Sequence, residues 1–235
     1  TLPYRPLAGV VPCPGGWLVA GAKLQGTTMS PEEPVVLRTF VEVLDTKPAF
    51  EIIALGAAVG LPDIPAAGGR QCDREARALL GWPRSGAIIS PPARAALAAR
   101  SYTKARAANG GRLSAVAWAR LARLAEIEEV IAPYWQRTVF EVNPELSFHQ
   151  LNEDAPLLYP KQSQVGIKER TDLVVGRISG MQRIVDARVR GAGVAHRLDA
   201  AACLWTARRI AAHAVRRLPE EPVWDAQGLR MEIVR

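Results

Sequence analysis

The sequence is short of residues that could cross-link or anchor the chain. Its three cysteines, Cys13, Cys72 and Cys203, form no CxxC pair and no Cys/His pair at zinc-finger spacing, which suggests neither a disulfide framework nor a structural zinc site. We expect them to be small buried hydrophobic residues. The longest apolar run, residues 52–62, contains two glycines and is far shorter than the ~20 residues of a bilayer span. We therefore expect no membrane helix.

Several functional signatures are also missing. The sequence contains no GxSxG nucleophile elbow and no phosphate-binding P-loop, and the glycine pair at 191 and 193 lacks the third glycine and the preceding strand of a dinucleotide site. The first six residues, TLPYRP, lack the basic start and the apolar core of a secretory signal. These absences favour a cytoplasmic protein with none of these common catalytic motifs.

Lysine is scarce, although the chain is basic. Only five of the 30 basic residues are lysines, and the formal net charge is +7. Such a charge suits a nucleic-acid partner, because neutralising phosphates supplies most of the non-specific affinity. A composition bias toward arginine and alanine accounts for the same charge, and the basic residues are scattered except for a denser stretch at 177–217. Both interpretations stay open at this point.

The pattern of apolar residues predicts one α/β domain. With 235 residues and 49% hydrophobic content, the chain can bury a core without cross-links. Strands are predicted at 7–12, 16–24, 34–40, 50–56 and 137–143 and an edge strand at 229–234, with helices at 41–48, 72–80, 92–108, 113–131, from Pro144 onward and at 194–218. This order is that of the RNase H-like (ribonuclease H-like) fold. We therefore expect a mixed five-stranded sheet flanked by helices, with a helical insertion at about 64–135 and a C-terminal helix that crosses the site.

The stretch RQCDREAR, residues 70–77, brings several charges together at a helix start. Acids near the positive end of a helix and salt bridges along one turn explain this pattern as a structural feature, which is the favoured interpretation. The alternative is that Arg70, Asp73 and Arg77 bind substrate.

The stretch VFEVNPELSF, residues 139–148, carries two acids. Glu141 lies between Phe140 and Val142 in a predicted strand, so its side chain points to the opposite face from theirs and is either solvated or aimed into a site. Glu145 follows Pro144 in the first turn of a helix, where it is either a response to the helix dipole or a catalytic candidate.

The closing helix contains His196 and Asp199, three residues apart on one face. Two such ligands can share a metal ion. The face around Asp199 is otherwise small and apolar, and burying an unpaired acid there is costly. A hydrogen-bonded pair that packs helices together remains the alternative explanation.

These stretches resemble a family of bacterial and archaeal proteins described as predicted nucleases of the RNase H fold and catalogued as domain of unknown function 429. The resemblance covers nearly the whole chain. It rests on the segments at 12–20, 59–63, 70–77, 139–148, 161–170, 198–211 and 228–233. It implies metal-dependent phosphodiester hydrolysis with Mg²⁺ or Mn²⁺, the hydrolase chemistry of the fold, and nucleic acid as a partner.

The chain departs from the family pattern at two positions. Family members typically carry an aspartate where this chain has Val11, followed by a glycine where it has Pro12, and a second aspartate where it has Gly56. RNase H-like nucleases use clustered carboxylates to hold two divalent ions roughly 4 Å apart. Loss of both acids predicts a degenerate site.

Three function hypotheses follow from this resemblance and its departures. In the leading one, Asp199, Glu141 and Glu145 are the catalytic candidates and Asp199, Glu141 and His196 are the surviving metal ligands of a weakened nuclease. In the second, the chain is a non-catalytic module that binds nucleic acid or a protein partner. In the third, it is a small-molecule hydrolase or transferase that uses the helix at 70–77.

Overall fold

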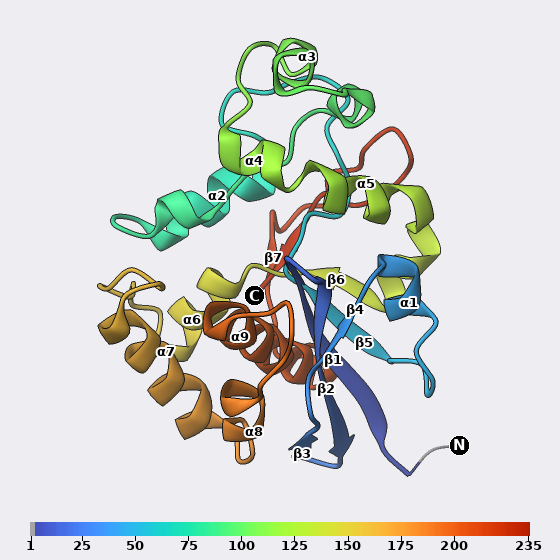
Figure 1. Cartoon of the computed structure of the whole chain (residues 1–235). Helices are drawn as coiled ribbons and strands as arrows, with labels where there is room; N and C mark the ends of the chain where they lie inside the picture. The colour runs from blue at the N-terminus through green and yellow to red at the C-terminus, as the bar shows by residue number, and fades with distance from the viewer. Residues whose placement is uncertain (1–2) are drawn as a thin grey trace.

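A long antiparallel hairpin forms the centre of the fold. The computed structural model describes residues 3–235 (Figure 1). Strand β1 (Arg5–Cys13) pairs along its whole length with β2 (Gly16–Gln25), and Cys13 faces Gly16 across a two-residue turn. Gly16 has φ 137°, a region that residues with a side chain rarely adopt. Both strands cover the ranges predicted from the sequence and are longer than predicted by one or two residues at an end.

The main sheet has six strands rather than the predicted five. Its order is β3-β2-β1-β5-β6, and β4 also pairs with β2. The predicted strand at 34–40 is present only as the shorter β4 (Val35–Leu37), and β3 (Thr28–Pro31), which was not predicted, pairs with β2 after a break along the same edge. Pro31 and Pro34 lie at the break, and proline has no N–H to continue a ladder. Strands β5 (Ile52–Leu55) and β6 (Val139–Glu141) continue the sheet parallel to β1.

One face of the sheet is covered by helix α9 (Val194–Ala211), against which α6 (Pro144–Leu151), α7 (Gln164–Arg177) and α8 (Gln182–Asp186) pack (Figure 1). The helix lies directly on β1 at Gly9, where a Cβ atom would fall 2.1 Å from the Ala200 carbonyl oxygen. Only glycine permits this approach. The predicted helix at 194–218 ends earlier, and His213 follows its end with φ 54°.

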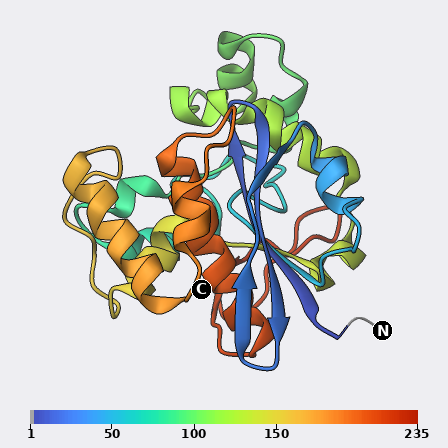
Figure 2. The same cartoon turned by 60° about the horizontal axis from the view of Figure 1, so that its bottom comes forward.

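The opposite face is covered by α1 (Phe40–Leu44) and α5 (Leu121–Val130), which Figure 2 shows on the far side of the sheet from α9. Trp17 and Phe40 pack here with their ring centroids 5.0 Å apart. The alternation of the strands divides them between the two cores: Ala8, Val10 and Leu55 point to this face, whereas Val11 points to α9. This parity decides which strand residues can meet Asp199.

The predicted insertion at 64–135 forms a helical block above the sheet (Figure 1). It contains α2 (Gln71–Leu80), η1 (Ser85–Ala87), η2 (Arg94–Ala98), α3 (Tyr102–Ala108), α4 (Ala115–Ala119), α5 and η3 (Pro133–Arg137). Helix α2 agrees with the prediction to within one residue. The predicted helix at 92–108 is instead η2 and α3, because the Ser101 hydroxyl accepts from the Lys104 N–H and starts a new helix. The predicted helix at 113–131 is broken at Arg120.

The C-terminal tail lies at the β6 edge. Strand β8 (Ile233–Val234) pairs with β7 (Arg217–Leu218) in a second sheet, and a single parallel bridge between Val142 and Val234 links the tail to the main sheet. The predicted edge strand is thus present but pairs mainly with β7. The three cysteines are free and buried, as predicted. Within residues 3–235, every helix is too short or too polar to cross a bilayer.

Candidate functional site

A large cavity lies where strands β1 and β5 end beneath the helical block. It measures about 850 Å³. Strand ends, α4, α5, α6, α9 and the loop before α7 all contribute to its wall. The lining includes Val11, Pro12, Gly56, Ile89, Val116, Arg120, Arg123, Asn143, Glu145, Lys161, His196 and Asp199. Three of the predicted site residues, Glu145, His196 and Asp199, therefore share one cavity.

Asp199 is held by a lysine from another element. The Lys161 ammonium lies 2.6 Å from the Asp199 Oδ2 atom. The other carboxylate oxygen, Oδ1, is buried without a hydrogen-bond partner in the described part of the chain. A buried carboxylate oxygen without a partner is unfavourable, while the Lys161 contact leaves the Oδ2 side of the carboxylate next to a half-exposed side chain. Lys161 thus occupies the side of Asp199 where a cation would bind.

The ends of β1 and β5 are neighbours, as the parallel pairing predicts. The Gly56 N–H donates to the Val10 carbonyl at 2.7 Å, and Val11 points into the space beside Gly56. A Cβ atom on Gly56 would lie 2.8 Å from Val11 Cγ1 and 3.4 Å from Cys203 Sγ. The place where two strand-end aspartates were expected in the family pattern is therefore filled by apolar atoms.

Glu145 lies beside Asp199 in the first turn of α6. The Asn143 side chain caps this helix and accepts from the Glu145 N–H at 2.9 Å. Glu145 Oε1 accepts from Arg170 Nη2 at 2.6 Å. Burial raises the pKa of Glu145, the Arg170 charge opposes that rise, and the Asp199 charge adds to it. A raised carboxyl pKa beside a second carboxylate is typical of functional sites, although ion-pair networks produce it too.

Arg170 supports Glu145 from the interior. Its side chain is fully buried, lies over the Phe148 ring at 5.3 Å, and donates to the Tyr159 and Gly166 carbonyls. Its Nε atom is buried without a partner. This arginine fixes the Glu145 carboxylate, so Glu145 presents a charge that the protein has already neutralised.

His196 lies one turn from Asp199 on α9, as its spacing predicted. Its Nδ1 atom accepts from the Gly193 N–H at 3.2 Å, so the neutral ring carries its proton on Nε2. Burial lowers the pKa of His196, while Asp199 opposes the change. A neutral imidazole in the cavity wall offers one N–H donor to a ligand.

Glu141 lies on the other face of the sheet from Asp199. It pairs in register with Leu55, and residues in register on parallel strands point the same way. Leu55 and Val10 face the α1/α5 side, so Glu141 is directed away from the cavity. Glu141 points to the opposite face from Phe140, as predicted, but the register decides which face of the sheet that is.

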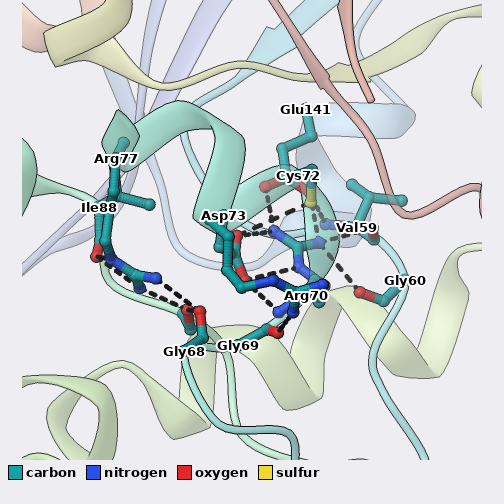
Figure 3. A network of polar contacts seen from close by, with 12 residues as sticks. Val59, Gly60, Gly68, Gly69, Arg70, Cys72, Asp73, Arg77, Ile88 and Glu141 are labelled. Atoms are coloured by element: carbon teal, nitrogen blue, oxygen red, sulfur yellow. Dashed lines mark hydrogen bonds and ion pairs between the residues drawn. The ribbon is translucent and has the colours of Figure 1, made fainter. Parts of the chain in front are cut away.

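Arg70 holds Glu141 in a buried ionic network (Figure 3). Arg70 Nη2 and Nη1 lie 2.5 and 2.8 Å from the two Glu141 oxygens, and the Val59 N–H donates to Glu141 at 2.7 Å. Asp73 accepts from the Arg70 side chain at 2.8 and 3.2 Å. Burial raises the pKa of Glu141 to about 7 against the opposing charge of Arg70. Burial would also raise the pKa of Asp73, but Arg70 brings it below its ordinary value.

The predicted substrate-binding residues Arg70, Asp73 and Arg77 make structural contacts. The side chains of Arg70 and Asp73 are 1% exposed, and the Arg70 guanidinium is bonded to Asp73, to Glu141 and to the carbonyls of Val59 and Gly60. Arg77 lines a second cavity of 230 Å³, but its guanidinium donates to the carbonyls of Gly68 and Ile88 (Figure 3). The alternative interpretation of this stretch, a salt-bridged helix start, describes these contacts.

The predicted metal set is not assembled. Within residues 3–235, no group of three or more His, Cys, Asp and Glu side chains is placed to hold a metal ion. The reasons are local: Glu141 is on the opposite face, Asp199 is paired with Lys161, and Val11 and Gly56 carry no ligand atoms. The donors of this cavity do not fit the divalent ion that the resemblance implies, so no step through Mg²⁺ or Mn²⁺ can be derived for it.

Sequence reasoning missed the cations of the cavity. Arg120 and Arg123 line it beside Lys161. Lys161 pairs with Asp199 and Arg123 with Glu126, whereas Arg120 takes part in none of the ion pairs found within residues 3–235. Arg120 lies between α4 and α5, on the same side as the lining residues Val116, Ala119 and Arg123. No local motif marks this placement, although Lys161 lies in one of the segments that carry the family resemblance.

Comparison with known proteins adds one finding. Residues 9–223 match the model of a family described as "Protein of unknown function (DUF429)". Searches of curated proteins and of solved structures found no match.

Proposed function

The chain belongs to the DUF429 family of proteins of unknown function, and we propose that it is an RNase H-like domain that binds a phosphate-bearing ligand without metal-dependent hydrolysis. The strand arrangement supports the first part. Three strands are antiparallel in the order β3-β2-β1, and β1, β5 and β6 are parallel. This is the order that the element pattern of the sequence indicated.

The observation that carries the proposal is the contact between Lys161 and Asp199. A lysine ammonium at 2.6 Å supplies the positive charge that a divalent ion would bring to this carboxylate. The two-metal clamp of phosphodiester hydrolysis needs several carboxylates around the same point, and Val11 and Gly56 have none. In this cavity the Lys161 ammonium therefore occupies the position beside Asp199 that a metal ion would take.

The remaining charges of the cavity favour an anion. Lys161 and Arg123 are paired, but the Arg120 guanidinium has no ion-pair partner among residues 3–235, and it lies close enough to Asp199 for the two charges to interact. Guanidinium groups bind phosphate through paired N–H donors, and ammonium groups bind it as point charges. With the Nε2–H of His196 in the same wall, the cavity offers three kinds of donor to a phosphate.

Metal-dependent hydrolysis by Asp199, Glu145 and His196 is the competing function. One observation favours it, namely that Asp199 Oδ1 has no partner in the described residues. It would require Lys161 to leave Asp199 and a third ligand to replace Glu141. The binding function requires neither change.

The two functions separate in one set of assays. We expect no cleavage of DNA, RNA or branched substrates with Mg²⁺ or Mn²⁺, and we expect calorimetry to detect binding of either a nucleoside monophosphate or a short oligonucleotide. Lys161→Met should weaken that binding about tenfold, as the loss of one charge-assisted hydrogen bond predicts.

Lys168→Met is the matched control. Lys168 pairs with Asp172 at the same 2.6 Å, but on the exposed surface of α7, and its loss should leave binding unchanged. Metal-dependent cleavage that disappears in Asp199→Ala and persists in Asp172→Ala would overturn the proposal, as would the absence of binding to every phosphate compound.

A further inference from the structure

We infer that the ligand of this cavity is a small phosphate monoester with hydroxyl groups and an apolar or flat body, of the nucleoside monophosphate class, rather than a nucleic-acid strand. This inference rests on the proposed function and specifies the ligand of the same site. It is carried by the size of the cavity, by the two kinds of side chain that line it and by two contacts between elements that carry lining residues.

The size of the cavity is that of a small-molecule site. Such sites measure roughly 300–1,000 Å³ and combine apolar walls with a few polar groups. The cavity measures about 850 Å³. It therefore has room for a phosphate together with a ring system, and far more room than inorganic phosphate needs.

The lining of the cavity combines two kinds of side chain. Its charged and polar members include Arg120, Lys161, Glu145, Asp199 and His196. Cations bind the phosphate of a ligand, and carboxylates can accept hydrogen bonds from its hydroxyl groups. A ligand that satisfies these side chains has both an anionic group and hydroxyl donors.

Much of the remaining lining is apolar. It includes Val11, Pro12, Ile89, Val116, Ala119 and Ala122. Val116, the second residue of α4, keeps 50% of its surface exposed. An apolar or flat ligand body that covers Val116 and Ile89 would gain the free energy of removing this surface from water.

Two contacts join elements that carry lining residues. The Gly15 N–H donates to the Gly191 carbonyl at 3.1 Å, and a Cβ on Gly191 would lie 2.8 Å from Gly15 Cα, so the β1–β2 turn, which carries the lining residue Pro14, touches the loop before α9. Arg84 Nη1 donates to the Tyr159 carbonyl at 3.4 Å, which joins the helical block to the loop that carries Lys161. A strand that passed through the cavity would have to avoid these connections, whereas a single nucleotide fits within the cavity volume.

The test compares ligands in the full chain by calorimetry. The probes are ribonucleoside monophosphates, inorganic phosphate and a short single-stranded oligonucleotide. We expect at least one nucleoside monophosphate to bind about tenfold more tightly than either of the other two probes, because it contacts both the charged and the apolar residues of the cavity.

Val116→Asn tests the contribution of the apolar lining residues to binding, and Val165→Asn is its matched control. Val165 is also the second residue of a helix that a serine caps, and it is 53% exposed, but it lies on α7 outside the cavity lining. Val116→Asn should weaken nucleoside monophosphate binding about fivefold to tenfold and leave inorganic phosphate unaffected. Val165→Asn should change neither.

The possible outcomes distinguish this inference from the proposed function. Binding of the oligonucleotide alone would overturn the inference and leave the proposed function in place. Equal affinity for inorganic phosphate and nucleoside monophosphates, with no effect of Val116→Asn, would also overturn it. No binding of any probe would overturn both.

Discussion

Two clusters of charged side chains lie on opposite faces of the sheet and differ in how completely their charges are satisfied. The first consists of Arg70, Glu141 and Asp73, in which the arginine contacts both carboxylates and the protein backbone. The second consists of Lys161, Asp199 and Glu145 and lines the cavity, where Lys161 is 40% exposed and Asp199 has an unpartnered oxygen. Both combine a basic residue with two acids, but the second is more exposed to solvent, through Lys161 and Asp199.

This difference shows why charge patterns in the sequence overstate the functional role of the first cluster and understate that of the second. A buried arginine that satisfies two carboxylates stabilises the fold and has no donors left for a ligand. A half-buried lysine that contacts one carboxylate keeps further N–H donors for a ligand. The position of a cluster relative to solvent, rather than its composition, therefore indicates where binding takes place.

The largest effect is expected from Arg70→Met. The substitution leaves two buried carboxylates without their cation, which should lower the free energy of unfolding by about 3–5 kcal/mol. Denaturant unfolding measures the change. Arg74→Met is the control, because Arg74 lies on the same helix but is exposed. A loss in Arg70→Met no larger than in the control would show that the first cluster is not structural.

A smaller effect is expected where the strand ends meet. Gly56→Ala places a Cβ 2.8 Å from Val11 Cγ1, and overpacking of this kind costs about 1–3 kcal/mol. Adding Val11→Ala should recover most of that loss, which a double-mutant cycle measures as a coupling.

Gly86→Ala is the control for this strand-end contact. Gly86 also lines the cavity, but nothing lies within 4 Å of its Cβ position, so the substitution should be nearly neutral. Additive losses in the double variant would mean that Val11 and Gly56 do not touch.

The smallest effect on stability is expected from Lys161→Met. Its pair with Asp199 is accessible to water, which hydrates the carboxylate once the lysine is gone, so we expect a loss of about 1 kcal/mol or less. Thermal unfolding with Lys168→Met as the reference measures it. If Lys161→Met destabilised the protein as much as Arg70→Met, the two clusters would have the same structural role and the comparison would fail.

Much of the fold could be predicted from local pattern, because hairpin turns and helix caps act within a few residues. The β1–β2 turn, the start of α2 and the Asn143 cap of α6 are of this kind. The division of the third strand into β3 and β4 depends on two prolines whose effect on the ladder is visible only once the pairing is known.

The site could be predicted only in part, because its assembly depends on register. His196, Asp199 and Glu145 meet because α6 and α9 cover the same face. The direction of Glu141 follows from its pairing with Leu55, a long-range fact that the strand alternation alone does not contain. Arg120 lines the cavity together with Val116 and Arg123, but the helix pattern of the sequence does not say which face of that helix meets the strand ends.

The contact between Gly9 and Ala200 has a consequence for motion. Since α9 rests on β1 backbone to backbone, with no side chain between them at that point, the helix has little freedom to slide or tilt, and Asp199, next to Ala200, shares that rigidity. The wall of the cavity that α9 forms is therefore rigid. If the cavity closes around a ligand, the segments around Arg120 and Val116 in the helical block have to move toward α9.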